Sequence, residues 1–178
     1  MCCTWGLEEK VGEAVLQGYA LKNVTEFKYL RSTVGSDGEL DNEICARIQA
    51  GWGKWKEASG VLCDNRIPEK LKGMFFAVVV RPTMLHGSQC WPLKIVQQNK
   101  LEASQSRMLR WALGIKWQDK LENEYVRLRV GIESMEQRLR ENRLRWFGHV
   151  VRMEEDDAIK RVRKMQIPGE ARGGVDLD

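Results

Sequence analysis

Residues 41–56 read DNEICARIQAGWGKWK, and they mark the point at which the pattern of the chain becomes helical. Four large apolar residues recur every three or four positions along this stretch: Ile44, Ile48, Trp52 and Trp55. This spacing places them on one face of an α-helix, and we expect Asp41 to be its N-cap. Gly51 and Gly53 each weaken a helix by about 1 kcal/mol relative to Ala, so a glycine on either side of a tryptophan predicts close backbone packing or a bend.

Helical spacing of apolar residues continues over most of the remaining chain and predicts five further helices. We expect them at 68–80, 92–114, 122–129 and 132–153, with a last basic helix ending at Met165. The 68–80 helix is apolar almost all round and is expected at the centre of the protein, with Pro82 ending or kinking it. Four residues are expected on its inner face: Leu71, Phe75, Val78 and Val79.

The segment before Asp41 has a different pattern. Residues 14–34 show partial alternation of apolar and polar residues, which predicts a β-hairpin with its turn near Lys22–Asn23. The expected fold class is therefore mainly α, with a short N-terminal β-hairpin. Residues 1–10 show no pattern, and the Gly-rich residues 168–178 are expected to be disordered.

The bulk composition is that of an ordinary globular protein. The 178 residues suffice for one domain or two small ones, and the net charge of +4 is only weakly basic. The longest apolar run, residues 74–80, is far too short to span a membrane, and no signal peptide is evident. We expect no membrane partner.

The cysteines indicate a reducing environment. They are odd in number, and no pair has C-x-x-C spacing: Cys2, Cys3, Cys45, Cys63 and Cys90. With only two histidines, which lie far apart, a zinc site is not expected. Free thiols favour an intracellular protein, in the nucleus or the cytoplasm. We expect Cys90 to be buried and His86 to be a packing residue.

No group of residues predicts catalysis. Asp37, Asp41 and Glu43 fit turn and cap positions, and the acidic run 154–157 fits a solvated segment. The sequence has neither a phosphate-binding glycine loop nor a dinucleotide motif. We therefore expect no catalytic residue, cofactor or metal.

A polar stripe on the 132–153 helix is the strongest candidate for a binding surface. We expect its members opposite an apolar face formed by Met135, Leu139, Trp146, Val150 and Met153. They recur at helical spacing: Arg138, Asn142, Arg145, His149 and Arg152. Three guanidinium groups in one line suit the tracking of phosphates. The alternative is a solvated face on which Glu133, Glu136 and Glu141 pair with the arginines.

Five short motifs occur in order along the chain: FKYL (27–30), GWGKWK (51–56), RPTMLHG (81–87) with Cys90-Trp91, RMLRW (107–111) and NRLRWFGHV (142–150). Their order and spacing resemble the C-terminal part of the reverse transcriptase of non-LTR (LINE-like) retrotransposons. The resemblance covers roughly residues 11–167 and does not include the catalytic aspartates of the palm. It departs from the family at Arg31, His86 and Gln89, where the family usually has Gly, Tyr and Glu.

The resemblance implies an organisation for the chain. Residues 11–38 would form a palm-edge hairpin and residues 39–117 a thumb-like helical bundle. Residues 118–167 would be a helical extension, either packed on the bundle or tethered to it. Lys28 would face a phosphate, although the residues alone favour an edge strand with a solvated lysine. Arg47 and Lys54 share a helix face that would either contact the duplex or be an ordinary solvated face.

The expected function is that of a reverse transcriptase fragment that is not an enzyme by itself. It would contact an RNA–DNA hybrid or other nucleic-acid duplex weakly and without sequence preference. One alternative is a helical protein-interaction module that binds a palm, or itself, through apolar surface near Trp5, Phe27 or Val78–Val80. Another is a retroelement remnant without function, as the departure of the Asp-containing C-terminal tail from the basic tail of the family suggests.

Overall fold

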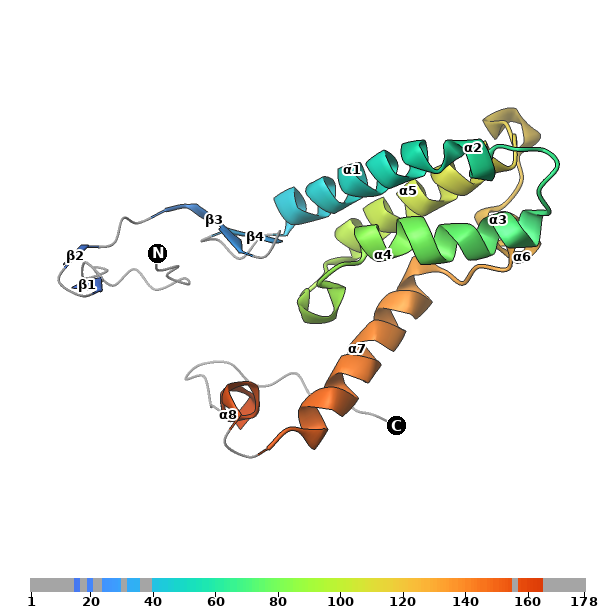
Figure 1. Ribbon diagram of the computed structural model, residues 1–178. Coiled ribbons are helices and arrows are strands. Elements are labelled where there is room, and N and C mark those ends of the chain that lie inside the picture. Colours follow the sequence, from blue (N-terminus) through green and yellow to red (C-terminus); the bar gives the residue numbers. More distant parts are fainter. Residues whose placement is uncertain are drawn as a thin grey trace.

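A computed structural model describes residues 15–16, 19–20, 24–29, 32–35, 40–154 and 157–164 of the chain. The fold is mainly α, as predicted (Figure 1). The longer helices are α1 (Asp41–Glu57), α5 (Ile95–Ala112), α6 (Asn123–Val130), α7 (Met135–Arg152) and α8 (Ala158–Lys164). Short helical pieces lie between them: α2 (Ser59–Leu62), α3 (Glu69–Phe75), the π-helix η1 (Phe76–Val80), α4 (Arg81–Met84), and the 3₁₀ turns η2 (Ser88–Cys90) and η3 (Trp117–Asp119). Within the described ranges, no helix has the length and apolarity needed to cross a membrane.

The strands pair differently from the single predicted hairpin. Strand β1 (Val15–Leu16) pairs antiparallel with β2 (Tyr19–Ala20), and β3 (Glu26–Tyr29) pairs antiparallel with β4 (Ser32–Gly35). The prediction of one hairpin turning near Lys22–Asn23 was therefore wrong, because each strand pairs with its nearest neighbour along the chain, which costs the least loop entropy. The predicted segments 1–10 and 168–178 lie outside the described residues.

The N-terminus of α1 is joined to α5. The N-cap is Leu40, so Asp41 is the first helical residue rather than the predicted cap. The Asp41 carboxylate accepts a 2.5 Å hydrogen bond from Lys100 and one of 3.3 Å from Gln97, both on α5. These bonds, that of Lys100 foremost, lower the pKa of Asp41. Asp41, which the local pattern assigns to capping, thus connects α1 to α5, a helix more than fifty residues further along the chain.

Of the two glycines in the GWGKWK motif, only one lies in a close contact. A Cβ at Gly51 would lie 2.4 Å from the Met84 side chain, whereas a Cβ at Gly53 would meet nothing within 4 Å. The close packing predicted from the glycine pair is thus confirmed at Gly51. It brings α1 against α4.

The buried face of the segment 69–84 differs from the predicted one. Leu71 and Val78 are exposed, while Phe76 and Val80 are fully buried. Phe75 and Val79, also predicted to point inward, are only partly buried. The physical reason is the π-helical turn η1, whose wider winding shifts the phase of the residues that follow it.

The same turn explains how the helix passes Pro82. A proline lacks the N–H needed for the regular helical bond, and its ring collides with the carbonyl group four residues earlier. A widened turn just before the proline relieves that collision. The helix therefore continues into α4 instead of ending near Val80. Gly87, with a φ of 80°, then turns the chain into η2.

A close approach between α3 and α6 depends on a glycine. A Cβ on Gly73 would lie 2.0 Å from the carbonyl oxygen of Val130, so only a residue without a side chain fits there. The neighbouring Lys72 is buried, and its ammonium group donates a 2.9 Å hydrogen bond to the carbonyl oxygen of Ala112 at the end of α5. A cation is favourable at a helix C-terminus, where carbonyl groups lack partners.

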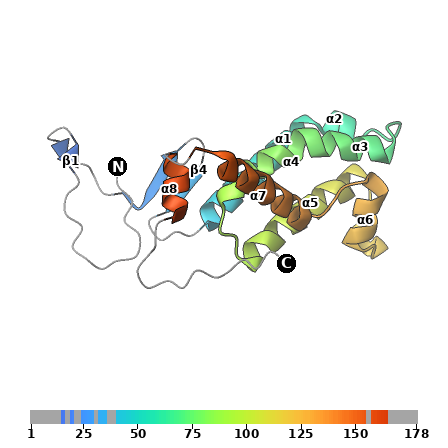
Figure 2. The ribbon, with the colours of Figure 1, turned by 90° about the horizontal axis from the view of Figure 1, so that it is seen from below.

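One hydrophobic core connects the bundle with the predicted extension. Its fully buried members come from α1, α2, η1, α4, α5, α6 and α7: Ile44, Leu62, Phe76, Val80, Met84, Leu101, Met108, Val126 and Met135. The extension is therefore packed on the bundle through α6 and the first turns of α7. The rest of α7 leads away from the bundle (Figure 1), and seen from below it lies in front of α4 and α5 (Figure 2).

Candidate nucleic-acid interface

The helix α7 starts later than its apolar pattern suggested. Gly131 adopts a left-handed conformation with a φ of 70° and ends α6, and Ser134 then caps α7. The Ser134 hydroxyl accepts a hydrogen bond of 3.2 Å from the N–H of Gln137, whose side chain accepts one of 3.3 Å from the N–H of Ser134. Ile132, the predicted start, is buried in the loop between the helices. Its apolar side chain therefore belongs to the core without belonging to the helix.

The apolar face of α7 is buried in part as the sequence predicted. Met135, Leu139 and Val150 are buried, whereas Trp146 and Met153 are half-buried. The polar stripe lies about a quarter of a turn from this face instead of opposite it, and the outward face carries the exposed Leu144, Phe147 and Val151. The predicted alternative, pairing with acidic residues, is also partly realised. The Glu141 carboxylate accepts hydrogen bonds of 2.5 Å from Arg138 and 2.6 Å from Arg145. One carboxylate thus serves two guanidinium groups, which leaves a net positive charge on this part of the stripe.

A groove runs along the polar face of α7. It encloses about 460 Å³ and is lined by Gln89, Asn142, Arg145, Trp146, His149 and Arg152. We call this the α7 groove. Four of the five predicted stripe residues therefore share one concave surface: Asn142, Arg145, His149 and Arg152.

Two hydrogen bonds join α7 to the segment that contributes Gln89. The Asn142 amide donates a 3.2 Å hydrogen bond to the hydroxyl of Ser88, which is fully buried in η2. The guanidinium group of Arg143 donates one of 3.1 Å to the carbonyl oxygen of Trp91. The sequence analysis missed Gln89 because the groove is formed by segments more than fifty residues apart, and no local pattern links them.

The lining of the groove suits an anionic ligand with a polar backbone. The Arg145 side chain is 68% exposed, and Arg152 is exposed as well. Trp146 was predicted on the apolar stripe, but it is half-buried and its ring lies 5.3 Å from that of His149. Guanidinium groups bind phosphate oxygens, while amide and imidazole groups bind sugar or phosphate oxygens.

Arg138 lies outside the α7 groove, beside an ion pair in which only the arginine, Arg81, is buried. Arg81 is buried, and its guanidinium group lies 2.9 Å from the Glu133 carboxylate; Arg138 lies 3.9 Å from the same carboxylate. Burial lowers the pKa of Arg81. Partial burial by itself raises the pKa of Glu133, but a backbone hydrogen bond and Arg81 outweigh it, so that this pKa is lowered. Arg138 shares the smaller hollow next to the groove, of about 180 Å³, with Arg81 and Asn142.

The other predicted contact residues are not part of the groove. Arg47 is buried and donates a 2.7 Å hydrogen bond to Glu43, so it belongs neither to a solvated face nor to an exposed binding surface. The sequence analysis failed here because Glu43, assigned to the first turn, is itself buried by the packing of β4 against α1. Lys54 is exposed and lies 2.6 Å from Glu57, and Lys28 is exposed on β3.

Two further predictions about single residues were wrong. Cys90 and His86 are both exposed, because the left-handed turn at Gly87 carries this segment over the surface of the bundle. Cys45 and Cys63 are exposed free thiols as well. In the part of the chain that the structure describes, no three His, Cys, Asp or Glu side chains gather in a way that would hold a metal ion.

The fold and the groove together define a mainly α-helical protein with a polar, arginine-lined surface on a projecting helix. No protein-family model, curated protein or solved structure matches this chain.

Proposed function

We propose that this chain is a non-catalytic piece of a non-LTR retrotransposon reverse transcriptase that binds nucleic-acid duplex through the α7 groove. The observation that carries the proposal is the convergence of Arg145, His149 and Arg152 with Gln89 in one exposed, concave surface. The five sequence motifs support the family origin, and an RNA–DNA hybrid is the duplex that this origin favours.

The dimensions of the groove fit a phosphate backbone. Arg145 and Arg152 are seven residues apart, which corresponds to about 10 Å along a helix axis. A duplex strand advances about 3.4 Å per phosphate, so this distance covers several phosphates of one strand. Contacts of this kind fix orientation without distinguishing sequence.

The two arginines are not equally available for such contacts. Arg145 shares Glu141 with Arg138, so a phosphate must compete with that carboxylate. Among the described residues, Arg152 forms no ion pair, and it is exposed at the end of α7. We therefore expect Arg152 to contribute at least as much to binding as Arg145.

A salt titration tests the proposal. Binding of the full chain to a labelled RNA–DNA hybrid is measured by fluorescence anisotropy, and we expect dissociation constants on the order of 10⁻⁴–10⁻⁶ M at physiological salt. Replacing Arg145 and Arg152 together by Ala should weaken binding and reduce the slope of log K against log salt by about 2. The matched control removes two exposed cations elsewhere, Arg66 and Lys70, and should leave the slope unchanged.

Three results would contradict the proposal. Equal effects of the two double variants would assign binding to net charge instead of the groove. Absence of binding by a folded sample would leave the family resemblance as a statement of ancestry only, in keeping with a remnant. Primer extension by this chain alone, in the presence of a divalent metal, would contradict its non-catalytic character.

An exposed apolar stripe favours a second candidate function, that of a protein-interaction module. Leu71, Met74 and Val78 follow one another at helical spacing on α3 and η1, and their exposed fractions are 51%, 66% and 75%. Of the predicted Val78–Val80 surface, Val80 is buried and Val78 is exposed. An apolar contact through this stripe, with a palm or a second copy, should hold or strengthen as salt rises, whereas phosphate binding weakens.

A further inference from the structure

A large aromatic residue is exposed at the C-terminal end of α5. The side chain of Trp111 is 58% exposed, although it belongs to a cluster of three tryptophans. Its ring centroid lies 5.3 Å from that of Trp52 and 5.8 Å from that of Trp55, both on α1. These edge contacts hold the indole in place, and the remainder of its surface faces outward.

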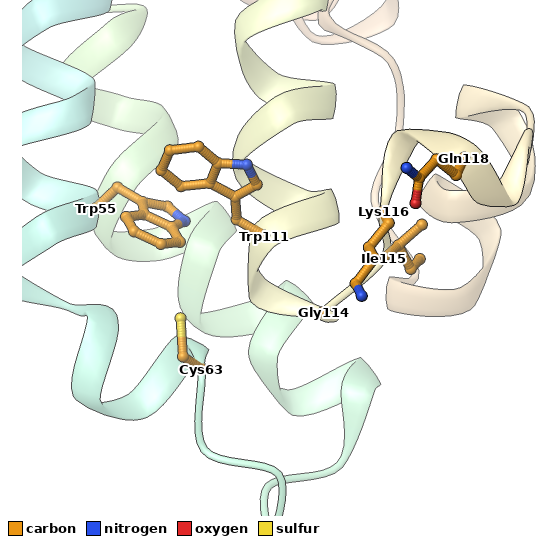
Figure 3. A pocket seen from close by; sticks show the side chains of 7 residues that line it. All are labelled: Trp55, Cys63, Trp111, Gly114, Ile115, Lys116 and Gln118. Atoms are coloured by element: carbon orange, nitrogen blue, oxygen red, sulfur yellow. The ribbon is translucent and has the colours of Figure 1, made fainter.

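A hollow of about 790 Å³ opens beside Trp111. Trp55, Trp111 and Cys63 line one side, and Lys116 and Gln118 from the segment after Gly114 line the other (Figure 3). The hollow is of the size of pockets that bind small molecules. Gly114 has a φ of 68°, which ends α5 and turns the chain so that Lys116 faces the tryptophans across the hollow.

The indole N–H of Trp55 lies beneath the ring of Trp111 and is closed to solvent. Trp55 is only 8% exposed, and its indole nitrogen has no hydrogen-bond acceptor among the described residues. Figure 3 shows that this nitrogen points toward Trp111, whose ring stands edge-to-face with that of Trp55. Trp55 therefore supports Trp111 from its inner side, while the outer side of the Trp111 indole stays open to a ligand.

We propose that this pocket binds an unpaired nucleobase of a nucleic-acid strand. The base stacks on the exposed indole of Trp111. Lys116 neutralises the adjoining phosphate. Stacking on an aromatic side chain suits any base, because every base has a flat π face.

The charges around the pocket are compatible with this ligand. Lys116 and Lys120 are exposed, and the Asp119 carboxylate accepts a 2.8 Å hydrogen bond from the Lys116 backbone N–H. The pocket lies at the end of α5, whereas α7 begins beside the middle of α5 and leads away (Figure 1). The inference extends the proposed function, since a strand leaving the duplex would supply the unpaired base.

Cysteine reactivity provides a local test on the full chain. Cys63 lines the pocket, while Cys45 and Cys90 are exposed elsewhere and serve as internal controls. The rate of alkylation by iodoacetamide is measured for each cysteine by peptide mass spectrometry. The probes are adenosine 5′-monophosphate and ribose 5-phosphate, which carry the same phosphate and differ in the base.

We expect adenosine monophosphate to slow the alkylation of Cys63 alone and ribose phosphate to have no such effect. Trp111→Ala should raise the concentration of adenosine monophosphate needed for protection by about 5- to 150-fold, the range for loss of one stacked base. Trp111→Phe should retain most of the protection, because an aromatic face remains. Equal protection by both probes, or protection by neither, would overturn the proposal.

The two proposals can fail separately. The variant lacking Arg145 and Arg152 should lose hybrid binding and keep the protection of Cys63, and Trp111→Ala should do the reverse. Protection of Cys63 that depends on protein concentration instead of nucleotide would show an interface between copies of the chain and would overturn the nucleobase assignment.

Discussion

Replacing Glu43 by Ala should lower the free energy of unfolding of this protein strongly. The loss should be larger than expected for a residue in the first turn of a helix. The Glu43 side chain is 1% exposed, and its carboxylate accepts hydrogen bonds of 2.7 Å from the Arg47 guanidinium group and 2.7 Å from the Thr33 backbone N–H. The first bond lies within α1, and the second connects α1 to β4. The variant would leave the Arg47 charge buried without this carboxylate and the Thr33 N–H without its acceptor.

The expected loss follows from that burial. Breaking a buried ion pair by removing one partner costs about 3–5 kcal/mol, because the desolvated charge that remains has lost that partner. An exposed pair on the same helix provides the matched control. Lys54 and Glu57 lie 2.6 Å apart with side chains 47% and 67% exposed, and Glu57→Ala should cost only about 0.3–0.5 kcal/mol.

Urea denaturation followed by far-ultraviolet circular dichroism measures both variants. A lower midpoint with an unchanged m-value would assign the loss to stability alone. The double variant Glu43→Ala, Arg47→Met should recover much of the loss, since apolar replacement of both partners is often close to neutral.

A loss below about 1 kcal/mol for Glu43→Ala, equal to that of Glu57→Ala, would refute the reasoning, because it is the cost of an exposed pair. Arg47 would then be accessible to solvent and would return as a candidate phosphate contact beside Lys54. If Arg47 is buried, as in this structure, it does not contribute to the salt dependence of binding.

Two glycine variants are expected to shift stability in opposite directions in the same urea assay. Gly73→Ala forces α3 away from Val130 and should destabilise by about 1–3 kcal/mol or more, while Gly53→Ala meets open space and should stabilise by about 0.5–1 kcal/mol; equal effects would contradict the close approach of α3 to α6. Acid should weaken the protein partly through Glu133, whose folded pKa lies below its ordinary value of 4.5. The stabilisation is therefore complete above about pH 4.5 and is lost as the pH falls through the folded pKa, so Glu133→Gln should reduce the difference between urea midpoints at about pH 6 and about pH 3.5. An unchanged difference would mean that Arg81 does not depend on this carboxylate.

Local signals in the sequence were sufficient for the helical class and for some helix ends. Gly114, the predicted end of the 92–114 helix, adopts the left-handed conformation just after α5. Both α5 and α7 begin three residues later than predicted, at Ile95 and Met135. The period of apolar residues marked the buried residues Met135, Leu139 and Val150 of α7, whereas the polar stripe lies beside this face instead of opposite it. These features depend on residues within one or two turns of each other, so the pattern itself carries the information.

Packing between distant segments decided the rest. The π-helical turn before Pro82 changed which residues of the 69–84 segment face inward, and the contact of β4 with α1 buried Glu43 and Arg47. Gln89 meets the α7 stripe, and Trp111 meets Lys116 across a hollow, only because the chain folds back on itself. A periodic sequence shows which residues share a face of a helix. Which faces meet depends on shape and charge matching between segments far apart in the chain, and that is settled only when the tertiary structure forms.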